Sequence, residues 1–102
     1  MNNKYFAIIT FYQFKIIKDK NHIIAKLKDF CKFNKIKGTI LIADEGINGT
    51  IAGLEKNINS FILYLENFSF EKLNLKRSKY KYMPFQKLKI RNKNEIVTLR
   101  TK

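Results

Sequence analysis

The sequence predicts an α+β domain of the ferredoxin-like, split βαβ class, in which an antiparallel sheet carries two helices on one face. Strand-like and helical segments follow one another in the order strand, helix, strand, strand, helix, strand. Both helical segments have one apolar face, which suits packing against a sheet. The chain of 102 residues is long enough for a single domain, and residues 92–102 could begin a linker to a further domain.

The first strand and the first helix are predicted from a change in periodicity. Residues 5–16 are rich in β-branched and aromatic side chains and contain neither Gly nor Pro, which predicts a strand. From residue 19 to residue 34 the apolar residues recur at helical spacing. Asp19 or Asn21 could cap the start of that helix.

A hairpin is predicted next. Residues 39–43 form a short apolar strand, residues 44–46 a turn, and residues 47–52 the returning strand. Asn48-Gly49 is a competing tip, because Asn-Gly is a strong turn signal. The earlier turn is preferred because it leaves Ile47 and Ile51 on a single face.

The second half supplies a helix and the remaining strands. Residues 56–67 form a second amphipathic helix, and residues 75–79 are either a short strand or an extended linker. Pro84 marks a break before a last long strand at 85–91, and a further apolar segment spans 95–99.

The net charge points to a polyanionic partner. Twenty-one Lys and Arg stand against eight Asp and Glu, giving a formal charge of +13. Eleven of these cations follow Glu71, where Glu95 is the only acid. A field of this sign favours nucleic acid. The alternative is codon drift, because 18 of the cations are Lys and Asn, Ile and Phe are also over-used. Arg77 and Arg91 favour the functional interpretation, since Arg binds phosphate in a fork that Lys lacks.

Alternation in the last long strand separates charge from apolar surface. Leu88 and Ile90 fall on one face, and the neighbouring cations fall on the other. A polyanion could therefore run along the sheet while the apolar face stays buried. The residues predicted to bind RNA are Lys76, Arg77, Lys79, Lys81, Lys87, Lys89 and Arg91.

Aromatic residues form a second group of candidates. Phe6, Tyr12 and Phe14 share one face of the first strand, with Phe11 on the other. The aromatics on the open face could stack bases, but the strand at 47–52 has no aromatic, so a domain interface is preferred there. Exposed Tyr among Lys before Pro84 suits single-stranded RNA, and an ordinary basic linker is the alternative. The candidates for stacking or interface are Tyr12, Phe14, Tyr80 and Tyr82.

No catalytic centre, metal site or cofactor site is predicted. His22 is the only histidine and is expected on a helix surface, and Cys31 is expected to be a buried apolar residue. Asp44 and Glu45 are expected to form a solvated turn. One cysteine excludes an internal disulfide, which favours the cytoplasm. No segment is apolar for long enough to span a bilayer, so no membrane partner is expected.

Three segments carry a family resemblance, namely 11–14, 38–53 and 76–97. The second contains Ala-Asp-Glu-Gly-Ile-Asn-Gly-Thr at 43–50, and the third contains Pro-Phe-Gln-Lys-Leu-Lys-Ile at 84–90. In this order and at this spacing they resemble the N-terminal domain of the rhodanese-like tRNA uridine hydroxylase family.

The resemblance implies an acylphosphatase-like, ferredoxin-like domain that engages tRNA. Members of that family use molecular oxygen to convert the wobble uridine of certain tRNAs to 5-hydroxyuridine, with the reactive cysteine in a C-terminal rhodanese domain. The chain ends where that domain is expected to begin, and Cys31 does not match the reactive cysteine. The resemblance therefore implies tRNA and a rhodanese-like domain, in cis or in trans, as partners, and it leaves open whether this chain alone is an enzyme.

Two other functions follow from the same fold. The open sheet face could dock a separate rhodanese-like subunit without touching RNA. Acylphosphatase activity would need a phosphate-binding loop with an Arg directly after the first strand, whereas residues 15–20 contain neither Gly nor Arg. We therefore do not expect acylphosphatase activity.

Overall fold

The computed structural model describes residues 5–93, and the apolar segment predicted at 95–99 and most of the predicted linker at 92–102 lie outside this range. The elements are β1 (Phe6–Phe14), α1 (Lys20–Phe33), β2 (Lys37–Ala43), β3 (Gly46–Leu54), α2 (Glu55–Leu65), the 3-10 helix η1 (Glu66–Phe68), β4 (Asn74–Tyr80) and β5 (Leu88–Asn92).

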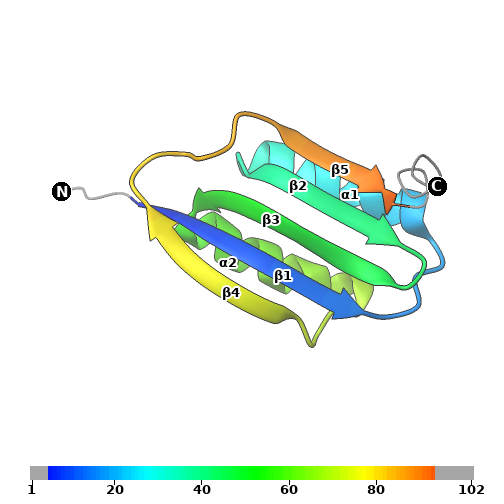
Figure 1. Cartoon of the computed structure of the whole chain (residues 1–102). Helices are drawn as coiled ribbons and strands as arrows, with labels where there is room; N and C mark the ends of the chain where they lie inside the picture. Colours follow the sequence, from blue (N-terminus) through cyan, green and yellow to red (C-terminus); the bar gives the residue numbers. More distant parts are fainter. Residues whose placement is uncertain (1–4, 94–102) are drawn as a thin grey trace, which may run out of the picture.

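The five strands form one sheet in the order β4-β1-β3-β2-β5, and both helices pack behind it (Figure 1). The first four strands pair in antiparallel fashion, while β5 runs parallel to β2 at one edge. The predicted fold class is confirmed: this is an α+β, ferredoxin-like sheet with two helices on one face. The sheet is mixed rather than wholly antiparallel because a fifth strand has been added to the split βαβ unit.

The fourth strand of that unit is β4, which resolves the alternatives for residues 75–79 in favour of a strand. The last strand begins at Leu88 rather than at residue 85. The physical reason is the sheet order, since β4 and β5 lie at opposite edges and the chain between them must travel around the end of the sheet (Figure 1). Residues 81–87 are used for that crossing.

The hairpin turns at Asp44 and Glu45, as predicted, and Asn48-Gly49 lies inside β3. Gly49 is needed there for packing, because a Cβ atom would lie 2.6 Å from the carbonyl oxygen of Thr39 on the neighbouring strand. Such an approach requires a residue without a side chain.

Both helices match the predicted segments closely. Asp19 occupies the N-cap position of α1, but its side chain makes no capping hydrogen bond. The second helix ends at Leu65, and η1 continues it for three residues. The αL conformation of Ser69, with φ of 68°, then ends the helical segment.

The core lies between the helices and the covered face of the sheet. Phe61 of α2 is fully buried, with its ring 5.8 Å from that of Phe11 on β1 and 6.2 Å from that of Phe30 on α1. Within residues 5–93, none of the buried side chains is polar or charged. The covered face of the sheet and the helices packed on it therefore provide the hydrophobic stabilisation of the fold.

None of the helices in the range 5–93 is long and apolar enough to cross a membrane.

Candidate nucleic-acid interface

The sheet face turned away from the helices is left uncovered by them (Figure 1). Alternation along β1 buries Ile9 and Phe11 against the helices. The same alternation directs Thr10, Tyr12 and Phe14 to the open side, where all three are exposed. No helix packs over these residues in the described part of the chain.

Because the strands pair in register, residues of neighbouring strands lie side by side in rows that run across this face. Five residues from five different strands pair in one line across the sheet: Lys76, Thr10, Thr50, Thr39 and Lys89. The next line is Asn74, Tyr12, Asn48, Leu41 and Arg91. In the first line hydroxyl groups occupy the middle strands and a cation stands at each edge. In the second line Asn48 lies between Tyr12 and Leu41, and Arg91 is the one cation. The hydroxyls of Thr10 and Thr50 are 3.1 Å apart and hydrogen-bonded.

The seven predicted cations do not all lie on this face. Lys76, Lys89 and Arg91 do, as their register shows. Arg77 points to the helix side, where its Nη2 donates a hydrogen bond of 2.8 Å to Oδ1 of Asn59 on α2. Lys79 shares that side, because it pairs with the buried Ala7.

The other two predicted cations lie in the connection between β4 and β5. Lys81 follows β4 and Lys87 precedes β5, and both are exposed. The backbone carbonyl of Lys87 accepts a hydrogen bond of 2.9 Å from the N–H of Gly38, which anchors the start of β5 beside β2. These two residues therefore lie outside the paired strands that make up the rows.

The predicted aromatic residues form two separate pairs. Tyr12 and Phe14 meet edge to face on the open side, with ring centroids 5.7 Å apart, and Phe14 is 79% exposed. Tyr80 pairs with Phe6 at the opposite end of β1, and it contacts Tyr82 with centroids 6.2 Å apart. The two pairs therefore mark opposite ends of the same face.

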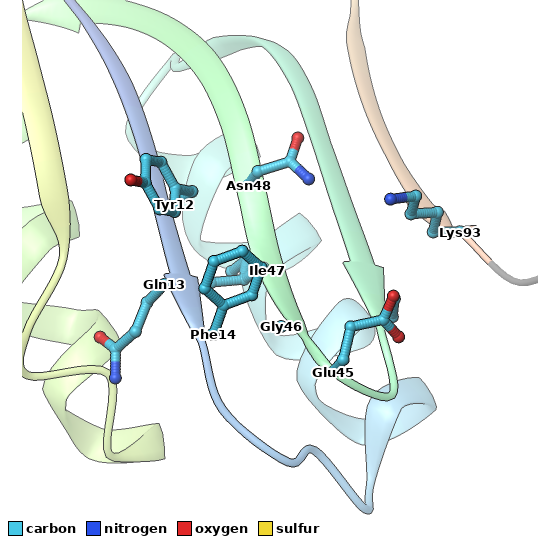
Figure 2. A pocket seen from close by; sticks show the side chains of 9 residues that line it. Tyr12, Gln13, Phe14, Glu45, Gly46, Ile47, Asn48 and Lys93 are labelled. Atoms are coloured by element: carbon cyan, nitrogen blue, oxygen red, sulfur yellow. The ribbon is translucent and has the colours of Figure 1, made fainter.

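A hollow of about 400 Å³ opens beside the first of these pairs, next to the β2–β3 turn. Tyr12 and Phe14 rise from β1 on one side of it, while Glu45 and Lys93 lie on the far side (Figure 2). Asn48 of β3 stands between them. Its side-chain amide makes no hydrogen bond to another residue in the range 5–93.

The polar residues in the middle of this face were not among the predicted site residues. Thr10, Thr39, Asn48 and Thr50 carry no motif of their own. Alternation in the predicted strands would have placed each of them on the open side. The signal that could have found them is the hairpin register, because it fixes which residues of three strands stand side by side.

Residues 5–93 contain neither an activated nucleophile nor a group of side chains that could bind a metal ion. Cys31 is fully buried, and that burial raises the pKa of its thiol to about 12, so the thiol stays protonated and unreactive. His22 is exposed on α1, as predicted. No three His, Cys, Asp or Glu side chains in this range are grouped so that they could hold a metal ion.

The loop between β1 and α1 is not built to bind phosphate. The backbone N–H of Lys15 donates to the carbonyl of Glu45, and the N–H of Ile17 donates to that of Asp44, both at 2.9 Å. Two donors that a phosphate loop would need are therefore used to hold the hairpin. The ammonium of Lys20 forms an ion pair with Asp44, which also places a carboxylate beside the loop.

Solved structures share the architecture. An acylphosphatase from Coxiella burnetii superposes with a TM-score of 0.58 at 9% identity, over 86% of this chain and 94% of that one. Full-length HypF superposes with a TM-score of 0.63 at 15% identity, over 87% of this chain and 12% of that one. At such identities the likeness concerns the fold alone. By its fold, the molecule is an acylphosphatase-like domain whose uncovered sheet face has basic edges.

The particular family follows from the sequence match. Residues 6–96 match the UPF0176 acylphosphatase like domain, and the chain belongs to that family. Similar proteins include the tRNA uridine(34) hydroxylase of Wolbachia sp. subsp. Brugia malayi, 41% identical over 92% of this chain and 35% of the relative. The tRNA uridine(34) hydroxylase of Bradyrhizobium diazoefficiens is 40% identical over 96% of this chain and 40% of the relative.

The chain therefore spans little more than a third of the length of these relatives. The family resemblance predicted from the three sequence segments is confirmed.

Proposed function

We propose that this chain is the N-terminal, tRNA-engaging domain of a tRNA uridine(34) hydroxylase. The observation that carries the proposal is the open sheet face, where hydroxyl and amide groups on the middle strands lie between cations on the edge strands. Homologues named tRNA uridine(34) hydroxylase support the choice of tRNA among polyanions.

The position of the cations suits a nucleic-acid strand laid on the sheet. Lys76 stands at one edge of the face, and Lys89 and Arg91 stand at the other. At the usual spacing between strands the two edges are about 19 Å apart. Phosphates can meet the edges while ribose and base groups meet the hydroxyl and amide groups between them.

Protection of sheet edges is a simpler explanation for part of this charge. Lysines on edge strands prevent pairing with other sheets. That explanation applies equally to both faces of β4, including Arg77 and Lys79. Edge protection does not explain why three threonines and Asn48 lie across the middle strands of one face.

Catalysis is assigned to another part of the enzyme. The buried thiol of Cys31 and the exposed His22 offer no activated group. We propose that oxygen-dependent hydroxylation to 5-hydroxyuridine takes place in a rhodanese-like domain, supplied in cis or in trans, while this domain holds the tRNA. The reducing cytoplasm, where tRNA is found, is the proposed location.

The test compares two triple variants of equal charge change, using total tRNA as ligand. The first replaces the open-face cations Lys76, Lys89 and Arg91 with Gln. The second replaces the exposed cations Lys26, Lys28 and Lys32 of α1 with Gln. Each lost phosphate contact should flatten the log–log salt dependence of binding by about 0.7 to 0.9 units, so the first variant should flatten it by about two to three.

The α1 variant should change the slope much less. Equal slopes of the salt dependence in the two variants would rule out the open face as the binding site. Absence of tRNA binding by the unaltered chain would instead favour the other function of this face, the docking of a rhodanese-like domain on the exposed Phe14 and its neighbours.

A further inference from the structure

We infer that the hollow beside the β2–β3 turn receives a single unpaired nucleobase of the bound RNA. The inference rests on the proposed function and adds to it a site for a base, where the basic edges provide only sites for phosphates. The groups that carry it are the rings of Tyr12 and Phe14, the amide of Asn48 and the ammonium of Lys93, all of which line the hollow.

The hollow exists because small residues stand beside a large one. In the sheet register Phe14 pairs with Gly46, and Gly46 pairs with Ala43. The ring of Phe14 therefore has no bulky neighbour on β3 or β2, and the space next to it stays open. A side chain at position 46 is excluded by the backbone, because a Cβ atom there would lie 2.5 Å from the carbonyl oxygen of Gln13.

The aromatic pair is arranged so that one ring supports the other. Tyr12 packs against Phe14 with an interplanar angle of 62°, and Phe14 remains 79% exposed whereas Tyr12 is 45% exposed. A base has a flat face on either side and stacks on an aromatic ring whatever its sequence. The ring of Phe14 provides most of the available stacking surface.

The polar groups complement the edge of a base. The Asn48 amide has one acceptor and one donor group side by side, and each of the four RNA bases has an adjacent donor and acceptor on its pairing edge. This amide can therefore pair with any of the four bases and reads the presence of a base rather than its identity. Lys93 approaches from the opposite side of the hollow, where it can meet the phosphate attached to the same nucleotide (Figure 2).

The hollow continues into the rest of the proposed interface. A second depression of about 260 Å³ adjoins it, and Tyr12 and Asn48 line both. The second depression is also lined by Thr10, Thr39 and Thr50, which belong to the row that ends in Lys76 and Lys89. An RNA strand with one base in the hollow can thus run along these hydroxyl groups toward the cations at the edges of the sheet.

Charge and polarity favour a nucleotide over an apolar peptide as the occupant. A peptide would bury Phe14 equally well, but it would also have to cover the Asn48 amide and the Lys93 ammonium in a chain with a net charge of +13. Covering such groups without new partners costs free energy. A nucleotide supplies a base edge for the first and a phosphate for the second.

The experiment measures binding of two single-stranded oligomers to the full chain. One is oligouridylate, and the other has the same length and phosphate count but abasic central positions. The unaltered chain should bind oligouridylate about fivefold or more tightly than the abasic oligomer, as expected for stacking of one base. Phe14→Ser should remove this preference, while Phe33→Ser, which changes an 86% exposed ring on α1, should keep it.

The outcomes separate the inference from the proposed function. The double change Lys89→Gln and Arg91→Gln should lower the affinity for both oligomers by the same factor, because both oligomers carry the same number of phosphates. Equal affinity of the unaltered chain for the two oligomers would overturn the base site and leave the basic edges intact. Failure to bind either oligomer, or retention of the preference in Phe14→Ser with circular dichroism unchanged, would also overturn it.

Discussion

The two faces of the sheet are built from the same strands and differ in almost every physical property. On the middle strands β1, β3 and β2 the covered face is apolar, and its side chains are packed against α1 and α2 with little or no exposure. The open face bears hydroxyl groups, an amide, exposed aromatic rings and cations at both edges. Because successive residues of a strand alternate between the two faces, one sequence specifies both.

The difference separates stability from recognition. Substitutions on the covered face should change the free energy of unfolding and leave the proposed RNA contacts unchanged while the domain stays folded. Substitutions on the open face should do the reverse. Phenylalanine gives a matched comparison, because Phe61 is fully buried and Phe14 is 79% exposed.

The largest effect is expected from Phe61→Ala. Its ring contacts Phe11 and Phe30 in the centre of the core, so its removal leaves a cavity and should cost about 3 to 5 kcal/mol of stability. Urea unfolding followed by circular dichroism measures it. A loss below about 1 kcal/mol would mean that the core is not packed as described.

A smaller loss of stability is expected from Cys31→Ser. The thiol is fully buried among apolar residues, and a hydroxyl in its place without a hydrogen-bond partner should cost about 1 to 3 kcal/mol. Binding of tRNA under conditions where the variant is folded should equal that of the unaltered chain. A selective loss of binding would show that Cys31 has a role at the interface.

Alkaline pH gives a related prediction from the same thiol. Burial raises its pKa from 9.0 to about 12 in the folded chain. The protonated thiol is therefore favoured by folding, and this contribution to stability is complete below pH 9 and lost as the pH rises toward 12. Thiol alkylation at pH 8 should follow global unfolding, and the stability difference between the unaltered chain and Cys31→Ala should shrink from pH 9 upward. Rapid alkylation of the folded chain would contradict burial.

Phe14→Ala should change stability by no more than about 0.5 kcal/mol, because the side chain is 79% exposed and its ring packs against Tyr12 at the surface. The same urea experiment used for Phe61→Ala measures it. A loss as large as that of Phe61→Ala would mean that Phe14 belongs to a core that extends beyond the described residues.

No conversion of uridine is expected from this chain alone. Neither Cys31 nor His22 is placed to activate oxygen or the base. Nucleoside mass spectrometry after incubation with unmodified tRNA should detect no 5-hydroxyuridine above the protein-free control. Its appearance in proportion to the chain would place catalysis within this domain.

Much of the fold could be predicted from the sequence because local patterns determine it. The two helices, the hairpin turn at residues 44–45 and the alternation in β1 all follow from spacing and turn residues. The place of β5 could not be predicted in this way, since pairing with β2 depends on a crossing around the end of the sheet. The same limit explains why the sequence predicts a last long strand at 85–91 and leaves 75–79 undecided, whereas β4 completes the split βαβ unit.

The candidate site was predicted less completely, and for a related reason. Lys89 and Arg91 share a face because they alternate in one strand, which sequence can show. Lys76 joins them, and Arg77 does not, because of register across five strands. Charge clustering along the chain cannot distinguish neighbours that point to opposite faces, and the threonine row is visible only when the strands are aligned.

The most direct test of the central claim is a chemical-shift map of the ¹⁵N-labelled chain titrated with tRNA anticodon stem-loop. We expect the shifts to concentrate on open-face residues of all five strands, including Thr10, Asn48, Thr39 and Lys89, while the outer surface of α2 is unchanged. Shifts confined to α1 and α2, with the open face unaffected, would contradict the assignment of RNA binding to the uncovered face of the sheet.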